Sequence, residues 1–179
     1  MNTSKVPPFS SSGAHRLCAD FCDMQQLIES CSRSYEQQLA PRGMVLCTRI
    51  RGPIPRFVRA DAEVIDRLFD CLGRCTSAVE ARGCAVLDIA AEPEGEDRHN
   101  IYLVLTLSGN GLDARQEEQL LAAQEGTDDE SASALQQARA ICRRYDGNIL
   151  IRNSSGFGTR FLVKLCLTVT PGGETVDHA

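Results

Sequence analysis

The chain has 179 residues, of which 42% are apolar, and a net charge of -5, which suits one globular domain with a sizeable core. The acidic balance and the absence of a run of lysines or arginines argue against nucleic acid and anionic membranes as partners. No apolar stretch reaches the roughly 18 residues needed to span a bilayer, and the N-terminus lacks an apolar signal core, so we expect a cytoplasmic protein without membrane insertion.

The chain divides into three parts by composition. Residues 1–20 are rich in serine and proline at first and predict a flexible N-terminal segment. Residues 21–169 carry periodic apolar patterns and predict the folded domain. Residues 170–179 show no structural signal, and we expect a disordered tail.

The first half of the domain predicts a helix, a strand and a second helix. Apolar residues recur at helical spacing from Met24 to Leu39, and Pro41-Arg42-Gly43 ends that helix. A strand is expected over 44–50 and a short one over 57–59. Asp61 is a good N-cap for the second helix, which we expect to end at Arg82-Gly83.

The second half predicts two hairpins and two helices. Strands over 84–91 and 101–107 form the first hairpin, and the second of them is apolar on both faces and therefore central. A Gly-x-Gly turn and a helix start follow, with Asp113 and Gln116 as a capping box. The last helix stops at Asp146-Gly147, and two strands over 148–152 and 159–169 close the domain. This order predicts an α+β fold: a two-layer sandwich with the helices on one face of a mixed, mostly antiparallel sheet.

The nine cysteines and three histidines do not predict a disulfide framework or a metal site. An odd number of cysteines scattered through apolar segments indicates small buried side chains in a reducing compartment. A metal site needs about four convergent ligands, and His15, His99 and His178 fall in tails or a turn.

The ordered set of motifs over residues 21–168 resembles the ATP-binding (catalytic) domain of histidine kinases, in the group that also holds gyrase, heat-shock-chaperone and mismatch-repair ATPases. The resemblance rests on Ala40-Pro41-Arg42-Gly43-Met44 before a strand, on Val58-Arg59-Ala60-Asp61 before the long helix, and on the glycine turn of Leu107-Ser108-Gly109-Asn110-Gly111. It also rests on Asp146-Gly147-Asn148-Ile149 and on residues 154–161, Ser-Ser-Gly-Phe-Gly-Thr-Arg-Phe. The resemblance implies a Bergerat-type fold and a nucleotide site.

The residues that should bind the nucleotide are replaced in this sequence. The family holds Mg²⁺ with asparagines on the long helix, and these positions fall on Cys71 and Cys75, whose thiols are poor ligands for that ion. Asp70 is adjacent in sequence to Cys71 but lies about 100° away around the helix. The family reads adenine with an aspartate where this chain has Leu107.

The phosphate-binding glycine box also departs from the family pattern. Its equivalent is residues 130–135, where Ala132 and Ala134 replace glycines, so close approach of backbone to phosphate is hindered. Carboxylates at 128–130 would repel a polyanion. The remnant positions of the site are Gly109, Gly111, Gly156, Gly158 and Thr159, and glycines there also serve turns with positive φ.

The sequence therefore favours a degenerate domain, a pseudo-ATPase that binds a protein partner in two-component or phosphorelay signalling. The partner would be a kinase's helical hairpin, a receiver domain or another copy of the chain. No catalytic residue and no cofactor are expected, with ATP and Mg²⁺ as the cofactors if the site is active. His15 fits a linker better than a phosphoacceptor, because that histidine lies on a two-helix hairpin in the family. An active kinase catalytic domain and an anti-sigma-factor-like switch on the same fold are the alternatives.

Overall fold

The computed structural model describes residues 21–77, 79–122, 129–154, 157–170 and 175–176. The helices are α1 (Met24–Leu39), α2 (Ala62–Thr76), α3 (Ala114–Ala122) and α4 (Glu130–Arg144), with a 3-10 turn at Ala40–Arg42. The strands are β1 (Phe21–Asp23), β2 (Val45–Arg51), β3 (Ile54–Pro55), β4 (Phe57–Arg59), β5 (Glu80–Pro93), β6 (Arg98–Gly111), β7 (Asn148–Ser154), β8 (Gly158–Val169) and β9 (Thr175–Val176).

The main sheet has seven strands in the order β1-β4-β8-β6-β5-β2, with β7 also paired to β8. Only β2 and β5 pair in parallel among these strands, so the sheet is mixed and mostly antiparallel. β6 is central, as its two-sided apolar pattern predicts. The predicted α+β class is confirmed.

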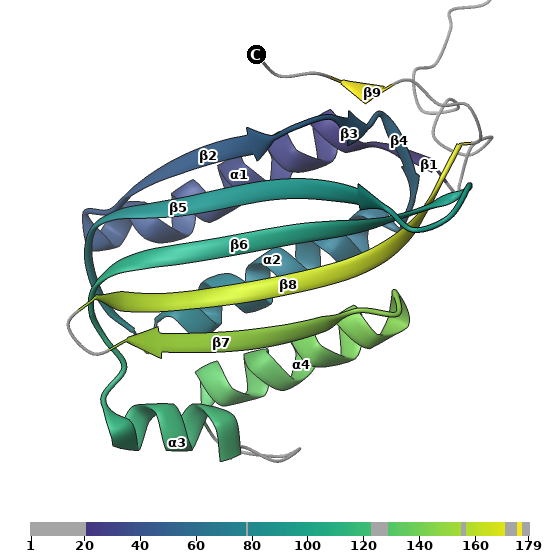
Figure 1. Cartoon of the computed structure of the whole chain (residues 1–179). Helices are drawn as coiled ribbons and strands as arrows, with labels where there is room; N and C mark the ends of the chain where they lie inside the picture. The colour runs from purple at the N-terminus through teal and green to yellow at the C-terminus, as the bar shows by residue number, and fades with distance from the viewer. Residues whose placement is uncertain (1–20, 78, 123–128, 155–156, 171–174, 177–179) are drawn as a thin grey trace, which may run out of the picture.

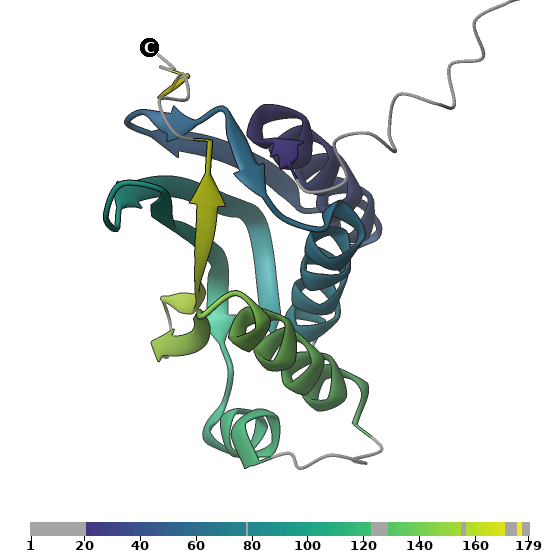
Figure 2. The same ribbon diagram turned by 90° about the vertical axis from the view of Figure 1, so that its right-hand side faces the viewer.

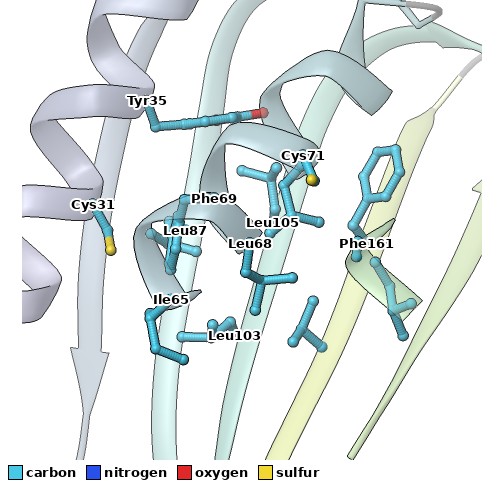
Figure 3. Packing of buried hydrophobic residues seen from close by; sticks show 14 of the residues in the cluster. Cys31, Tyr35, Ile65, Leu68, Phe69, Cys71, Leu87, Leu103, Leu105 and Phe161 are labelled. Atoms are coloured by element: carbon cyan, nitrogen blue, oxygen red, sulfur yellow. The ribbon is translucent and has the colours of Figure 1, made fainter. Parts of the chain in front are cut away.

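The helices cover one face of the sheet and leave the other face open. Figure 1 looks onto the open face, with α1 and α2 behind the strands, and Figure 2 shows the helical layer edge-on. The core lies between the layers, where Leu68 and Phe69 of α2 meet Leu103 and Leu105 of β6 and Phe161 of β8 (Figure 3). Burial of these side chains is the main stabilising term.

Carboxylates cap the starts of the helices, at Asp61 and Asp113 as predicted and also at Asp23. Asp23 and Asp61 accept hydrogen bonds from the first amides of α1 and α2. Asp113 and Gln116 form a reciprocal capping box before α3, with bonds of 2.7 and 2.9 Å. These caps satisfy backbone donors that have no partner within the helix.

The predicted end of the second helix at Arg82-Gly83 is wrong. α2 ends at Thr76, whose hydroxyl donates back to the carbonyl of Gly73 at 2.6 Å. The guanidinium of Arg42 then donates to the carbonyls of Thr76 and Val79 at 2.9 and 2.6 Å. A distant side chain therefore satisfies the helix end, and β5 begins at Glu80.

Two other segments differ from expectation. The Gly-x-Gly stretch is not a free turn, because β6 runs on to Gly111, and Gly109 and Gly111 pair with Ala81 and Glu80 of β5. In the tail over 170–179, Thr175–Val176 pairs with Ile54–Pro55 of β3. Residues 1–20 lie outside the described part of the chain.

Candidate functional site

The C-terminal half of α2 packs directly against the start of α4. We call this contact the α2–α4 seam and define it by Cys71, Arg74 and Cys75 of α2 with Ser131 and Gln137 of α4. The Cys75 thiol donates to the carbonyl of Ser131 at 3.5 Å, and the Ser131 hydroxyl donates to the carbonyl of Arg74 at 3.1 Å. The Arg74 guanidinium donates to the Gln137 side-chain carbonyl at 3.5 Å. The two helices are therefore joined by polar contacts at the positions where the resemblance places the Mg²⁺ ligands.

The two cysteines of the seam are buried, neutral thiols. Both are fully inaccessible to solvent. Burial raises the pKa of the Cys75 thiol to about 12 and also raises the pKa of the Cys71 thiol. A protonated thiol is not a ligand for Mg²⁺, which prefers oxygen. The residues present at this point do not fit a nucleotide-bound metal ion.

Asp70, the acidic residue that precedes Cys71 in the sequence, forms an ion pair with an arginine of the same helix. The carboxylate of Asp70 pairs with Arg74, one turn along α2, at 3.1 Å. Arg74 Nη2 also donates to the Cys71 sulfur at 3.4 Å. Asp70 therefore neutralises the arginine that joins the two helices.

The N-terminus of α4 is capped by the chain's own carboxylate. Asp129 Oδ1 accepts a hydrogen bond from the Ala132 amide at 2.9 Å, and the Asp129 carbonyl accepts from Ser133 at 2.9 Å. Ala132 and Ala134 are fully buried. A phosphate at this helix end would meet a carboxylate where it needs free amides.

Leu107 belongs to the core. Its side chain is fully buried, and its backbone pairs with Thr159 of β8. The Leu107 carbonyl lies so near Gly158 that a Cβ added there would come within 2.0 Å of it. With a φ of 105°, Gly158 is required for both backbone conformation and space.

Asn153 holds a structural role that the sequence does not single out. Its amide group bonds both the N–H and the carbonyl of Leu112, at 2.9 and 2.7 Å. Its oxygen also accepts from the hydroxyl of buried Thr159 at 3.0 Å. Asn153 thus ties β7 to the chain after β6, and a Cβ at Gly111 would come within 2.6 Å of it. The only sequence signal is an asparagine beside a predicted hairpin turn, which is too common to single it out.

What remains beside the seam is a small polar cavity. Its volume is about 260 Å³, and the described side chains around it are Ser77, Gln116, Gln119, Leu120, Asp129 and Ser131. Pockets for organic ligands generally measure about 300–1,000 Å³ and are mostly apolar. Of the remnant glycines that the structure describes, Gly109, Gly111 and Gly158, none lines this cavity.

The described remnant positions are engaged in contacts of the fold. Gly109, Gly111, Gly158 and Thr159 serve strand pairing and the Asn153 contacts, whereas Gly156 lies outside the described residues, as do Asp128 and His15. Within the described ranges, no group of three or more His, Cys, Asp or Glu side chains is placed to hold a metal ion. In the same ranges, no helix is long and apolar enough to cross a membrane.

Comparison with solved structures identifies the fold. Full-length ShkA in complex with AMPPNP superimposes with a TM-score of 0.61 at 14% identity, over 84% of this chain and 31% of that chain. The Acinetobacter baumannii histidine kinase AdeS superimposes with a TM-score of 0.57 at 19% identity, over 82% of this chain and 66% of that chain. The catalytic domain of the histidine kinase ThkA superimposes with a TM-score of 0.54 at 15% identity, over 81% of this chain and 92% of that chain. No protein-family model and no curated protein matches the sequence.

The chain therefore has the fold of the histidine kinase catalytic domain, as its motifs predict. It spans about a third of full-length ShkA but nearly all of the ThkA catalytic domain. At these identities the likeness establishes the fold alone.

Proposed function

We propose that this chain is a degenerate kinase-type ATPase domain that binds nucleotide weakly or not at all and acts in two-component or phosphorelay signalling through a protein partner. The observation that carries the proposal is the α2–α4 seam. Cys75 and Arg74 are hydrogen-bonded to Ser131 in the first turn of α4. The Asp129 side chain accepts a hydrogen bond from the Ala132 amide in the same turn. The groups that ATP would use in this fold are engaged in contacts within the chain.

The energetics support the loss of affinity. Each replaced contact, at Cys71 and Cys75, at Leu107 and at Ala132 and Ala134, is worth about 1–3 kcal/mol in a charged hydrogen-bonding site. Three such losses together weaken a micromolar site to about millimolar or beyond. Opening the seam to admit a nucleotide would add the cost of exposing the buried thiols.

A role through protein contacts is supported by what the chain retains. The core, the helix caps and the sheet order are complete although the ligand-binding positions have diverged. A folded domain that has lost its nucleotide-binding residues can still bind another protein through its surface. The partner would be a kinase's helical hairpin, a receiver domain or a second copy of the chain.

Isothermal titration with Mg-ATP and with Mg-AMPPNP tests the proposal. We expect no saturable heat at ligand concentrations up to about 1 mM, equivalent to less than about 4 kcal/mol of binding free energy. Full-length ShkA, which was crystallised with AMPPNP, is the positive control. A dissociation constant tighter than about 100 µM would contradict the proposal and support an active catalytic domain.

A further inference from the structure

The open face of the sheet carries a patch of mixed chemistry over β6, β7 and β8. Leu150 of β7 lies directly opposite Leu162 of β8, which in turn lies opposite Val104 of β6. In the next row, Arg152 of β7 lies opposite Arg160 of β8. We call these five residues the basic–apolar patch. They alternate along their strands with buried residues such as Ile149 and Phe161, which face the helices, so they lie on the open face of the sheet.

The patch is accessible to a partner. Leu150 is 48% exposed, and both arginines are exposed. Leu162 and Val104 are half-buried by their neighbours, which leaves part of each side chain open to solvent. The hairpin that joins β7 to β8 also presents Phe157, which is 87% exposed. Arginine and aromatic side chains around an apolar centre are the composition that is enriched in protein interfaces.

The two arginines of the patch contrast with those elsewhere on the same face. Arg49 and Arg51 of β2 both donate to the carboxylate of Asp88 on β5, at 2.9 Å. Arg152 and Arg160 face each other, and within the described part of the chain neither has a carboxylate at ion-pair distance. Like charges directly opposite in a sheet are destabilising. This arrangement is therefore a cost in the isolated domain, and a carboxylate supplied from outside would relieve it.

The charge distribution favours one kind of occupant. Two copies joined symmetrically through this patch would bring four arginines together, and like charges would repel. Two arginines beside an apolar row provide too few contacts for a nucleic-acid backbone. A protein segment that carries both carboxylates and apolar side chains would complement both the arginine row and the leucine row of the patch.

We propose that the basic–apolar patch is the docking surface for an acidic protein segment. Carboxylates of the segment pair with Arg152 and Arg160, and its apolar side chains cover Leu150 and Leu162. Arginine binds a carboxylate through two parallel hydrogen bonds, which gives such a contact directional specificity. The inference rests on the proposed function only in assigning a protein as partner. Because nucleotide binding is measured in a separate experiment, a failure of the docking proposal can be distinguished from a failure of the proposed function.

The test uses the full chain and a labelled peptide in which glutamates flank a pair of leucines, followed by fluorescence anisotropy at low ionic strength. We expect saturable binding that the double variant Arg152→Gln/Arg160→Gln weakens by about ten-fold or more. Arg33→Gln, an exposed arginine on α1 in the helical layer, is the matched control and should change affinity by less than about two-fold. Because all three positions are exposed, each variant should keep the melting temperature of the parent chain within a few degrees, about the spread of surface substitutions.

Two further measurements separate the chemistry and the location. A peptide with serines in place of leucines should bind more weakly, as should the Leu150→Ser variant with the original peptide. Amide shifts in nitrogen-15 spectra should concentrate on β7 and β8. The proposal is overturned by no binding at millimolar peptide, by equal binding of the double variant, by shifts confined to α1 and β2, or by a DNA oligonucleotide or anionic vesicle that binds the patch more tightly than the peptide.

Discussion

The identity of single side chains decides whether this fold can bind a nucleotide. At Leu107 the aspartate that would read adenine is replaced by a side chain that is fully buried in the core. At Cys75 the side chain is a thiol that burial keeps protonated, with a pKa of about 12. The replacements are therefore integrated into the packing, and reverting one of them will disturb the fold before it restores a ligand contact.

Leu107→Asp should destabilise the domain by about 3–5 kcal/mol, because the variant loses buried apolar contacts and places a carboxyl group without a designed partner in the core. The free energy of unfolding in urea measures the loss. Leu107→Met, which conserves volume, is the control and should cost less than about 1.5 kcal/mol. A folded Leu107→Asp variant with nearly parental stability would mean that the cleft is open behind β6.

Asp88 provides a pH-dependent contribution to stability. Hydrogen bonds from Arg49, then from Arg51, hold the pKa of the Asp88 carboxyl below its usual range. A lowered pKa in the folded state means that the contribution is complete above the unfolded value, about 3.9, and is lost as pH falls through the lower folded value.

Asp88→Asn should therefore lower the free energy of unfolding by about 1 kcal/mol at neutral pH, the upper range for an exposed but bidentate pair. The difference from the parent chain should shrink as pH falls below about 4. Denaturation series at several pH values check this. A difference that persists unchanged in acid would show that the amide disturbs packing and that the ion pair is not responsible.

At the scale of elements, the fold is held where helices and strands end. Arg42 satisfies the end of α2, and Asn153 connects β7 to Leu112 after β6. These contacts join positions far apart in the chain. Asn153 fixes the chain directly after Gly111, and the Gly-x-Gly backbone itself pairs with β5.

Asn153→Ala should cost about 1–3 kcal/mol, because the N–H and carbonyl of Leu112 and the hydroxyl of Thr159 lose their partner. Chemical denaturation checks the value, with Asn148→Ala as the control, since Asn148 is an exposed asparagine on the same strand. The control should stay within about 0.5 kcal/mol. Equal effects at the two positions would contradict the assigned role of Asn153.

The elements themselves could be predicted because their signals are local. The α1 span and the Asp61 cap follow from apolar spacing and from one side chain that bonds amides two and three residues ahead. The early end of α2 could not be predicted, because the arginine that satisfies it lies in another turn of the chain. The pairing of Gly109 and Gly111 with β5 depends likewise on where α2 ends.

For the whole molecule, the sequence motifs predict the fold, and the solved structures confirm it. The residues of the candidate site could be named from the sequence, but their surroundings could not. Whether Cys75 faces a cleft or a neighbouring helix depends on how α4 docks. That contact is formed by Ser131, and by Gln137, which no motif singles out. The patch on the open sheet face could not be predicted from the sequence, because its rows form only when β6, β7 and β8 pair.

The central claim is that the amides of Leu112 and Ala132, at positions where the resemblance places the nucleotide site, are already bonded within the chain. Nitrogen-15 spectra of the full chain during titration with Mg-ATP up to about 5 mM, enough to saturate a millimolar site, test it most directly. The account predicts that the amide signals of Leu112 and Ala132, bonded to Asn153 and Asp129, do not move. Shifts at these amides that saturate with a dissociation constant tighter than about 100 µM would contradict it.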